Sequence, residues 1–498
     1  MKLEVLLEGV EYSVLCGTLD KTVKSLSYHS DKADADTVFF ALRGEQNDGH
    51  DYIESLIKEG VEVFVTEEYN KKTERLKKRY ADSEALTILT VKNSRQALAL
   101  AASKFFGEPD KELISIGITG TKGKTATAYM LQAILENAGI RTGIIGTVRQ
   151  GFEGHYREAE NTTPQSYELY RAMREMLDGG CKAVVMEVSS QALMQHRTYG
   201  IEFDIAVFTN LSKDHIGKGE HGSMAEYIYW KSRLFMQSKL AVVNGDSPYA
   251  DDMLRDAIKA KGSSEFKAVR FGSEDVTGLM PFRRGQRLGM SFCYRGMEAE
   301  LGLPGAFSVY NAMAAMCAAE QLGIEPRDML PVLREIKICG RTELIPTEGD
   351  FTLLLDYAHN GDSMRRLLTA LRAYEPSSLV VLFGCGGNRD RSRRYEMGKA
   401  AAELADFSVI TSDNPREEPP ENIIADIVRA VAAEGGSCAV IPDRRRAIEQ
   451  TLSAAKQGDI IVICGKGHET YQIIGNEKIH FDDREAILSV TETRETEK

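Results

Sequence analysis

The stretch Ile116-Gly-Ile-Thr-Gly-Thr-Lys-Gly-Lys-Thr125 decides the fold of this chain. An apolar run from Leu113 to Ile118 leads into a glycine-rich turn, and the pattern then predicts an amphipathic helix from Ala126 to Asn137. Glycines let backbone N–H groups approach an anion, and the N-terminus of a helix adds a favourable dipole. Strand, turn and helix together therefore predict a phosphate-binding loop and a nucleotide site. The alternative is an ordinary glycine-rich turn between a strand and a helix.

Length and charge limit the classes of protein that the chain can represent. A chain of 498 residues predicts roughly three domains, and 43% hydrophobic residues are enough for large cores. A net charge of −12 argues against nucleic-acid binding by bulk electrostatics. There is no apolar run long enough to span a membrane and no cleavable signal pattern. The eight cysteines lack metal-ligand spacing and are expected to be reduced thiols. We expect a cytoplasmic monomer.

The order of predicted elements indicates an α/β protein with three domains. Residues 1–93 form a small α/β unit, residues 94–337 contain the phosphate loop, and residues 338–498 form a third unit. Short apolar runs alternate with helices in the second unit, which favours a doubly wound parallel sheet. Residues 266–303 alternate in polarity and are expected to be antiparallel strands. Apolar runs of the third unit predict another βα sheet of Rossmann-like type.

Three polar side chains of the central unit have either a functional or a structural interpretation. Glu187 follows a predicted strand and suits Mg²⁺ beside a phosphate loop, although a helix-capping acid would look the same. His215 follows another strand and is either a metal ligand or an ordinary loop histidine. Lys231 follows a predicted helix among aromatic residues, where a lysine that extends its ammonium group to solvent is the commoner explanation.

Three loops of the third unit each follow a predicted strand. They are Gly384–Asp390, Ser412–Arg416 and Gly465–Glu469. Loops at the carboxyl ends of parallel strands meet at one edge of the sheet, so Arg389, Arg416 and Glu469 are expected to converge. Arginines bind carboxylates through paired hydrogen bonds, and a carboxylate binds an ammonium group. The loops therefore predict a site for a small zwitterion, with a rim of solvated charge as the alternative.

In the order and spacing of its motifs the chain resembles the Mur ligase family along nearly its whole length, most closely the tripeptide synthetases of that family. The motifs that carry the resemblance are Gly120–Thr125, Asn161–Pro164, Met186–Ser190, Phe208–Leu211, Asp214–His215, Lys231, Gly305–Ala312, Gly340–Arg341, Asp356–His359, Asp413–Arg416 and Gly465–Glu469. The resemblance implies ATP-dependent amide formation. The γ-carboxylate of D-Glu in UDP-N-acetylmuramoyl-L-Ala-D-Glu would attack ATP, and an amino acid would then attack the acyl-phosphate.

The resemblance also implies roles for single residues. Lys124, His215 and Lys231 would be catalytic, with Lys231 carbamylated so that its charge becomes negative. Mg²⁺ would be held by Thr125, Glu187, His215 and Lys231. The ATP contacts would come from Gly120, Thr121, Lys122, Gly123, Lys124, Thr125, Asn311, Arg341 and Asp356. The UDP-sugar peptide would meet Ser30, Thr162, Thr163, Ser189 and Arg197. The amino acid would meet Arg389, Asp413, Asn414, Arg416, Gly465 and Glu469.

The third unit is expected to choose the amino acid. Asp413–Arg416 resembles the form found in enzymes that add meso-diaminopimelate, whose second α-carboxylate is absent from lysine. A cation placed for that carboxylate stays unpaired when lysine binds, which predicts discrimination. The chain departs from the family pattern at His29–Asp31, where only Ser30 carries over, at Gln191, at the long loop 214–221 and at Cys339–Leu344.

Other functions remain as alternatives. A related ligase could add L-lysine or extend folate with glutamate, although Asn161–Pro164 and the N-terminal unit argue against folate and Arg416 argues against lysine. A regulatory protein could use ATP as a switch, in which case no phosphate release would depend on an amino acid. An inactive paralogue could bind cell-wall precursors without reacting.

Overall fold

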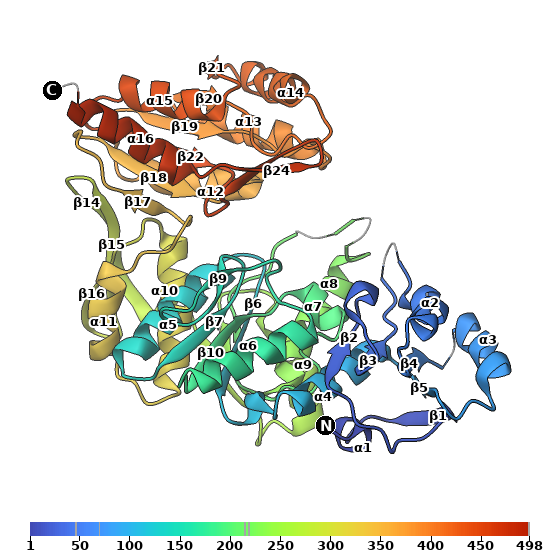
Figure 1. Cartoon of the computed structure of the whole chain (residues 1–498). Coiled ribbons are helices and arrows are strands. Elements are labelled where there is room, and N and C mark those ends of the chain that lie inside the picture. Colours follow the sequence, from blue (N-terminus) through green and yellow to red (C-terminus); the bar gives the residue numbers. More distant parts are fainter. Residues whose placement is uncertain (45–46, 69, 214–215, 218–219, 497–498) are drawn as a thin grey trace. The chain divides into compact units, whose positions relative to one another are not determined.

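The computed structural model describes residues 1–44, 47–68, 70–213, 216–217 and 220–496, with side chains up to residue 490 (Figure 1). The chain forms two compact units. The first comprises Met1–Phe271 with Ala314–Gly323, and the second comprises Gly272–Met313 with Ile324–Lys498. Both units are α/β, which confirms the predicted fold class.

The first unit begins with a five-stranded sheet in the order β1-β5-β4-β3-β2. Strands β2 to β5 are parallel and β1 is antiparallel to β5. The strands are β1 Tyr12–Cys16, β2 Ser25–Ser27, β3 Thr37–Phe40, β4 Val63–Glu67 and β5 Thr87–Val91. The helices are α1 Leu3–Leu6, α2 Ile53–Lys58, α3 Lys71–Tyr80 and α4 Ser94–Phe105, with 3₁₀ turns η1 Ser30–Lys32, η2 Gly49–Tyr52 and η3 Pro109–Lys111.

Helix α4 joins this small sheet to the larger sheet that follows. The helix starts at Ser94 and is capped by Asn93, whose side chain accepts hydrogen bonds from the backbone N–H groups of Arg95 and Gln96. Leu98 of α4 and Met173 of α6 (Ser166–Asp178) belong to one continuous buried cluster. The two sheets of the first unit therefore share a hydrophobic core.

The larger sheet has eight strands in the order β13-β12-β11-β6-β10-β7-β8-β9. It is parallel from β13 to β7 and ends in antiparallel strands β8 and β9. The strands are β6 Ile114–Thr119, β7 Thr142–Ile145, β8 Arg149–Gly151, β9 Arg157–Glu158, β10 Ala183–Glu187, β11 Phe203–Phe208, β12 Ser238–Asn244 and β13 Lys267–Phe271. The remaining helices are α5 Lys124–Asn137, α7 Ser190–Met194, α8 Met224–Met236 and α9 Ala250–Lys261.

One expectation for the stretch 266–303 is wrong at its start. Strand β13 pairs in parallel with β12, whereas antiparallel strands begin only at β14. The edge strand β13 is largely exposed, with Phe271 buried. Such one-sided burial produces the same alternation of polarity as an antiparallel strand, so the sequence pattern did not distinguish the two.

The second unit contains an antiparallel sheet, β14 Val276–Arg284, β15 Arg287–Tyr294 and β16 Met297–Leu301. Its main sheet has the order β17-β18-β22-β19-β20-β21 and is parallel except for β17. Those strands are β17 Glu343–Ile345, β18 Thr352–Asp356, β19 Leu379–Phe383, β20 Phe407–Ile410, β21 Cys438–Val440 and β22 Ile460–Cys464. This confirms the βα sheet predicted for the third domain.

Helices and a hairpin complete the second unit. The helices are α10 Ala306–Glu320, which extends into the first unit, α11 Pro326–Glu335, α12 Gly361–Arg372, α13 Ser392–Leu404, α14 Pro420–Ala433, α15 Arg444–Ala454 and α16 Asp483–Thr496, with η4 Ser273–Asp275. The hairpin consists of β23 Tyr471–Ile474 and β24 Glu477–His480. Among the described residues, no helix is both long and apolar enough to cross a membrane.

Candidate functional site

The predicted phosphate loop is present between β6 and α5. Gly120 has φ +154°, and a Cβ at this position would overlap the side-chain oxygen of Thr209. Gly123 has φ +85° and lies immediately before the first residue of α5. Both positions need glycine, because other residues rarely adopt these angles or would collide. The strand, turn and helix arrangement that the sequence predicted is therefore confirmed.

Hydrogen bonds from the segment that follows β11, mostly from its side chains, hold this loop in place. The Lys122 carbonyl accepts hydrogen bonds from Thr209 Oγ1 at 2.7 Å and from Asn210 Nδ2 at 2.9 Å. The Lys122 N–H donates to Asn210 Oδ1 at 3.0 Å, and the Thr121 N–H donates to the Asn210 carbonyl at 2.9 Å. The loop conformation is thus set before any anion arrives, which lowers the entropy cost of binding.

Two buried side chains with oxygen atoms suited to a metal ion, Thr125 and Glu187, meet at the end of the phosphate loop. Thr125 Oγ1 donates to Glu187 Oε2 at 3.0 Å, and Glu187 is 1% exposed. Thr147 also donates to this carboxylate, from its backbone N–H at 2.8 Å and from Oγ1 at 3.1 Å. Hydroxyl and carboxylate oxygens are the ligands that Mg²⁺ prefers. The two residues therefore fit the metal role expected of them.

Lys231 lies within α8, which continues to Met236, and not after the helix as expected; its side chain points at the phosphate loop. Its side chain is 1% exposed, and Nζ donates to the Gly120 carbonyl at 2.9 Å. Nζ also lies 4.6 Å from the centre of the Tyr227 ring. A Lys231 ammonium group that extends to solvent is therefore excluded here.

Lys124 Nζ donates to the same Gly120 carbonyl at 2.9 Å, so both lysines reach one point of the loop. His215 lies outside the described residues.

Sequence reasoning missed two residues of this site. A cavity of about 60 Å³ is lined by Lys124, Ser189, Ser190, Gln191, Met194, Glu220, His221, Tyr227 and Lys231. His221 is 2% exposed and its Nε2 lies 2.8 Å from Ser190 Oγ. Tyr227 lies one helical turn before Lys231 on α8, and its hydroxyl is 3.3 Å from Thr121 Oγ1. That helical spacing could have identified Tyr227.

The residues expected to meet the muramoyl peptide gather next to Glu187. Thr163 Oγ1 donates to the Glu187 carbonyl at 2.8 Å, and the Ser189 N–H donates to Thr163 Oγ1 at 3.2 Å. Arg197 Nη1 donates to the Thr163 carbonyl at 2.6 Å. Thr162 Oγ1 lies 3.0 Å from Thr147 Oγ1. Ser30 stands apart at the start of η1, in the small N-terminal sheet region.

The expected nucleotide contacts Asn311, Arg341 and Asp356 belong to the second unit. Asn311 is buried in α10. The Arg341 guanidinium lies 4.6 Å from the centre of the Tyr357 ring. Asp356, at the end of β18, accepts hydrogen bonds from the N–H groups of Thr342 at 2.7 Å and Ala358 at 2.8 Å. Burial raises the pKa of Asp356, although the Arg341 charge opposes this.

The three predicted loops of the third domain converge. A cavity of about 300 Å³ lies at the carboxyl ends of β18, β19, β20 and β22. It is lined by Tyr357, His359, Gly384, Cys385, Gly386, Arg389, Asp390, Arg393, Arg394, Asp413, Asn414, Arg416, Gly465, Glu469 and Tyr471. All six residues expected to bind the amino acid line this cavity. The predicted convergence of the three loops is therefore confirmed, whereas a ligand in this cavity stays a prediction.

Hydrogen bonds fix the polar groups of this cavity. Asn414 Nδ2 donates to Glu469 Oε2 at 2.9 Å, and Arg416 Nη1 donates to the Gly387 carbonyl at 2.9 Å. Arg416 has φ +54°, a conformation that is uncommon for residues other than glycine and asparagine. Burial raises the pKa of Glu469, and the charge of Asp413 raises it further. The carboxylates of Asp390, Asp413 and Glu469 thus share a small volume with a set of arginines.

Family models match three successive stretches of the chain. Residues 22–106 match the Mur ligase family catalytic domain, residues 118–319 the Mur ligase middle domain, and residues 340–467 the Mur ligase glutamate ligase domain. The chain belongs to the Mur ligase family. Its three-domain architecture accounts for both the phosphate loop and the separate arginine-lined cavity.

Full-length relatives of this Mur ligase carry a consistent name. UDP-N-acetylmuramoyl-L-alanyl-D-glutamate–2,6-diaminopimelate ligase of Caldanaerobacter subterraneus subsp. tengcongensis is 39% identical, with 98% of this chain and 99% of the relative covered. The enzyme of the same name from Clostridium perfringens is 36% identical, with 99% and 100% covered. A solved structure of such a ligase superimposes with a TM-score of 0.66 at 28% identity, covering 95% of each chain.

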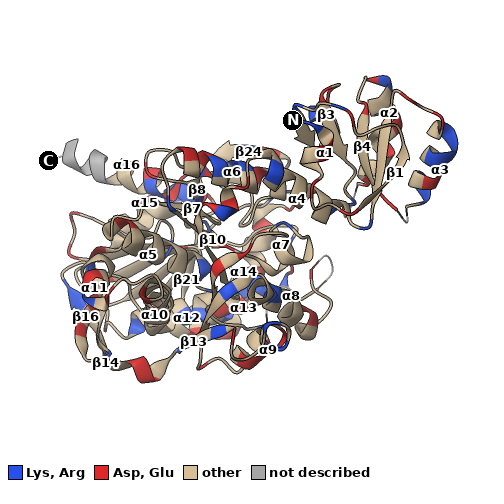
Figure 2. Cartoon of the chain, turned by 90° about the horizontal axis from the view of Figure 1, so that it is seen from below, with Lys and Arg blue, Asp and Glu red and all other residues tan. Residues whose placement is uncertain are grey.

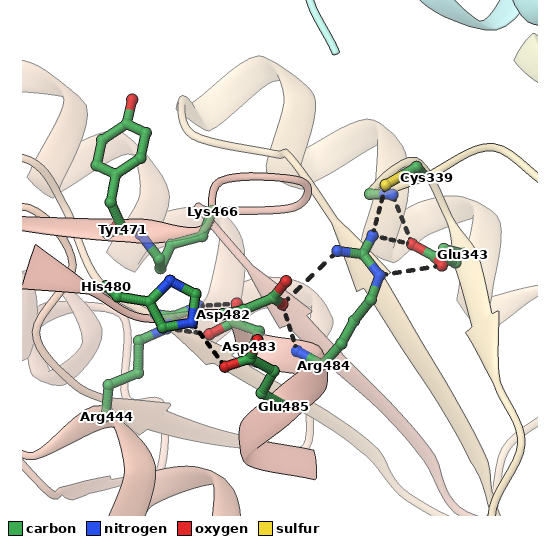
Figure 3. Close-up of polar contacts among 11 residues, drawn as sticks. Cys339, Glu343, Arg444, Lys466, Tyr471, His480, Asp482, Asp483, Arg484 and Glu485 are labelled. Carbon is green, nitrogen blue, oxygen red and sulfur yellow. Dashed lines mark hydrogen bonds and ion pairs between the residues drawn. The ribbon is translucent and has the colours of Figure 1, made fainter. Parts of the chain in front are cut away.

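A network of charged side chains supports the Gly465–Glu469 loop of this Mur ligase (Figure 3). Arg444 and Asp483 form a fully buried ion pair, with Nε to Oδ1 at 2.7 Å and Nη2 to Oδ2 at 2.8 Å. Lys466 is also fully buried; its Nζ donates to the Tyr471 carbonyl and lies 3.6 Å from Glu469 Oε2. Nearby, Arg484 contacts Glu343 and Cys339 (Figure 3). Removing one partner of such buried pairs costs about 3–5 kcal/mol.

Proposed function

We propose that this chain joins meso-diaminopimelate to the D-Glu γ-carboxylate of UDP-N-acetylmuramoyl-L-Ala-D-Glu, with ATP as the energy source, in peptidoglycan precursor synthesis. The observation that carries the proposal is the cavity in which Arg389, Arg416 and Glu469 converge, in a chain that also holds a phosphate loop. The shared name of the relatives supports it. We assign residues 1–93 to the UDP-sugar, 94–337 to ATP and 338–498 to the amino acid.

The first half of the reaction brings two anions together. The backbone of Gly120–Gly123 and the Lys124 ammonium group offset the phosphate charge of ATP, while the substrate carboxylate attacks the γ-phosphorus and ADP leaves. Thr125 and Glu187 supply oxygen ligands for Mg²⁺, which would lower the repulsion between the carboxylate and the phosphates. Asn311, Arg341 and Asp356 complete the nucleotide contacts.

We assign Lys231 a carbamate. Its Nζ is buried beside the Gly120 carbonyl, where neutral amine and CO₂ would give an anion in place of a cation. That anion and His215 would hold a second Mg²⁺. The carbamate oxygens would also accept from the neighbouring hydroxyl groups, of which Thr119 Oγ1 lies 3.5 Å from Nζ.

The second half of the reaction is amide formation. The diaminopimelate amine attacks the acyl carbon, and inorganic phosphate leaves. Ser30 is assigned to the uridine, and the peptide contacts are Thr162, Thr163, Ser189 and Arg197. Glu469 and Asp413 face the ammonium group of the amino acid, while Arg389, Asn414, Arg416 and Gly465 hold its carboxylates. We expect a monomer to carry out the reaction in the cytoplasm.

An omission experiment tests this function. Phosphate release and product mass are measured with UDP-N-acetylmuramoyl-L-Ala-D-Glu, ATP, Mg²⁺ and meso-diaminopimelate, and then with each component left out. We expect phosphate release and a product of tripeptide mass only in the complete mixture. Release that needs no amino acid would support an ATP switch instead, and silence of a folded chain in every mixture would support an inactive precursor-binding paralogue.

A further inference from the structure

Arg95, in the first turn of α4, has an unusual environment for an arginine. Its Nη2 donates to the Arg43 carbonyl at 3.0 Å. Its Nη1 is buried and has no hydrogen-bond partner within the described part of the chain. No carboxylate of the described residues forms an ion pair with it. A buried guanidinium N–H without an acceptor is costly, so its presence indicates a partner that the protein itself does not supply.

A second guanidinium, that of Arg197, belongs to a segment that meets α4 beside Arg95. Gln96 Nε2 lies 3.5 Å from His196 Nδ1, and these two residues are the chain neighbours of Arg95 and Arg197. Arg197 donates to the Gln195 side-chain oxygen, from Nε at 3.2 Å and Nη2 at 2.8 Å, and to the Thr163 carbonyl at 2.6 Å. These acceptors are neutral. Burial lowers the pKa of Arg197, and the charge of Arg95 lowers it further. Burial and then the charge of Arg95 also lower the pKa of His196. The positive charges of Arg95 and Arg197 thus act on each other in a partly desolvated region.

The carboxylates of this region are engaged elsewhere. Glu67 lies 3.6 Å from Arg43 Nη2, and Glu168 accepts a hydrogen bond from the Tyr28 hydroxyl at 2.9 Å. Their charges reach Arg95 and Arg197 only over a distance. The N-terminal N–H groups of α4 are also used, because Asn93 caps those of Arg95 and Gln96. The guanidinium groups are therefore what an incoming anion would meet.

The position of Arg95 identifies that anion. On one side is Tyr28, which stands two residues before Ser30 and whose hydroxyl, when ionised, would raise the pKa of Arg95. On the other side is Arg197, which contacts Thr163. In the proposed function, which this inference relies on, Ser30 meets the uridine and Arg197 the muramoyl peptide. The diphosphate is the group that links those two parts of the substrate. We propose that Arg95 binds the diphosphate of the UDP-sugar, with Arg197 as the second cation.

Competition experiments test this role. UDP and uridine are compared as inhibitors of phosphate release in the wild-type chain, in Arg95→Met, in Arg95→Lys and in a control, Arg75→Met. Arg75 is exposed on α3, where Figure 2 shows lysine and arginine gathered. We expect UDP to inhibit the wild type and the control more strongly than uridine does. In Arg95→Met the inhibition constant of UDP should rise about 10- to 100-fold, with uridine unchanged and Arg95→Lys intermediate.

The outcomes separate the possibilities. Arg95→Met should also raise the KM of the UDP-sugar peptide and leave the KM of ATP unchanged. If the role of Arg95 were purely structural, Arg95→Met would weaken inhibition by UDP and inhibition by uridine equally. Such a result overturns the proposal. Unchanged UDP inhibition in Arg95→Met overturns it too, while leaving the ligase function intact. A wild-type chain that neither uses the UDP-sugar peptide nor responds to UDP would instead overturn the proposed function and, with it, the role of Arg95.

Discussion

The phosphate loop and the arginine-lined cavity recognise charge by different means. At the loop, main-chain groups and two glycines of positive φ create the site, and Thr209 and Asn210 hold it in shape. In the cavity, side chains from three loops converge on a small volume. A backbone site suits a phosphate that every member of a family uses. A side-chain site can change by substitution without changing the fold. In the proposed function, common chemistry is therefore assigned to the loop and substrate choice to the cavity.

The largest effect is expected at the phosphate loop. Lys124→Met removes the ammonium group that offsets phosphate charge, and kcat should fall about 10³-fold or more whichever amino acid is offered. Phosphate release under saturating substrates measures this, with thermal unfolding to show that the variant is folded. A kcat near that of the wild type would mean that the loop does not serve the reaction.

Lys231→Ala tests the carbamate separately. Activity should fall about 10²–10³-fold, because one anionic group is lost where the metal and two anionic reactants meet. Added short-chain carboxylates such as acetate should partly restore phosphate release, since they can occupy the vacated space as an anion. Lys124→Met is the control that they should not rescue. A folded Lys231→Ala variant that no carboxylate restores would argue against the modification.

A change in the cavity should alter selection rather than chemistry. Arg416→Asn removes the guanidinium but keeps a residue that tolerates the φ of +54° found here. The kcat/KM for meso-diaminopimelate should fall about 10²-fold, whereas the KM of ATP should stay the same. Steady-state kinetics with each substrate varied in turn provides the test. An equal loss for both substrates would show that the cavity and the loop are not separable.

The smallest expected effect is a change in the pH at which the KM of the amino acid rises. Burial and the charge of Asp413 raise the pKa of Glu469, while Lys466 lowers it. As pH falls, Glu469 should therefore take up a proton earlier than an ordinary carboxyl group, and the KM of the amino acid should rise. Lys466→Met removes the opposing cation and should move this rise to higher pH. The pH profile of the ATP KM is the internal comparison, and a rise common to both substrates would exclude Glu469 as its cause.

Sequence patterns predicted the features that depend only on neighbouring residues along the chain. Arg389, Arg416 and Glu469 could be expected to converge because each follows a strand of one parallel sheet. Glycine spacing likewise indicated the phosphate loop. The exact start of α4 could not be predicted, because Asn93 and Ser94 are both good caps and only the extended backbone angles of Asn93 identify it as the cap.

Contacts between distant segments could not be predicted in the same way. Nothing in the sequence shows that Arg95 and Arg197 share one partly buried region, since that depends on how the segment after α7 lies beside α4, where Gln96 Nε2 is 3.5 Å from His196 Nδ1. The position of His221 beside Ser190 depends on the path of a long loop. Asn414 was expected to face the substrate, and its bond to Glu469 became apparent only when the two loops were placed together.

The measurement that tests the division between chemistry and selection most directly is the ratio of kcat/KM for meso-diaminopimelate and L-lysine in the wild-type chain. Phosphate release is followed with the UDP-sugar dipeptide, ATP and Mg²⁺ held at saturation. We predict that diaminopimelate is favoured by about 10²-fold or more, because lysine leaves Arg416 without its carboxylate. Equal or better use of lysine would leave the ligase chemistry in place but contradict the role of the arginine-lined cavity.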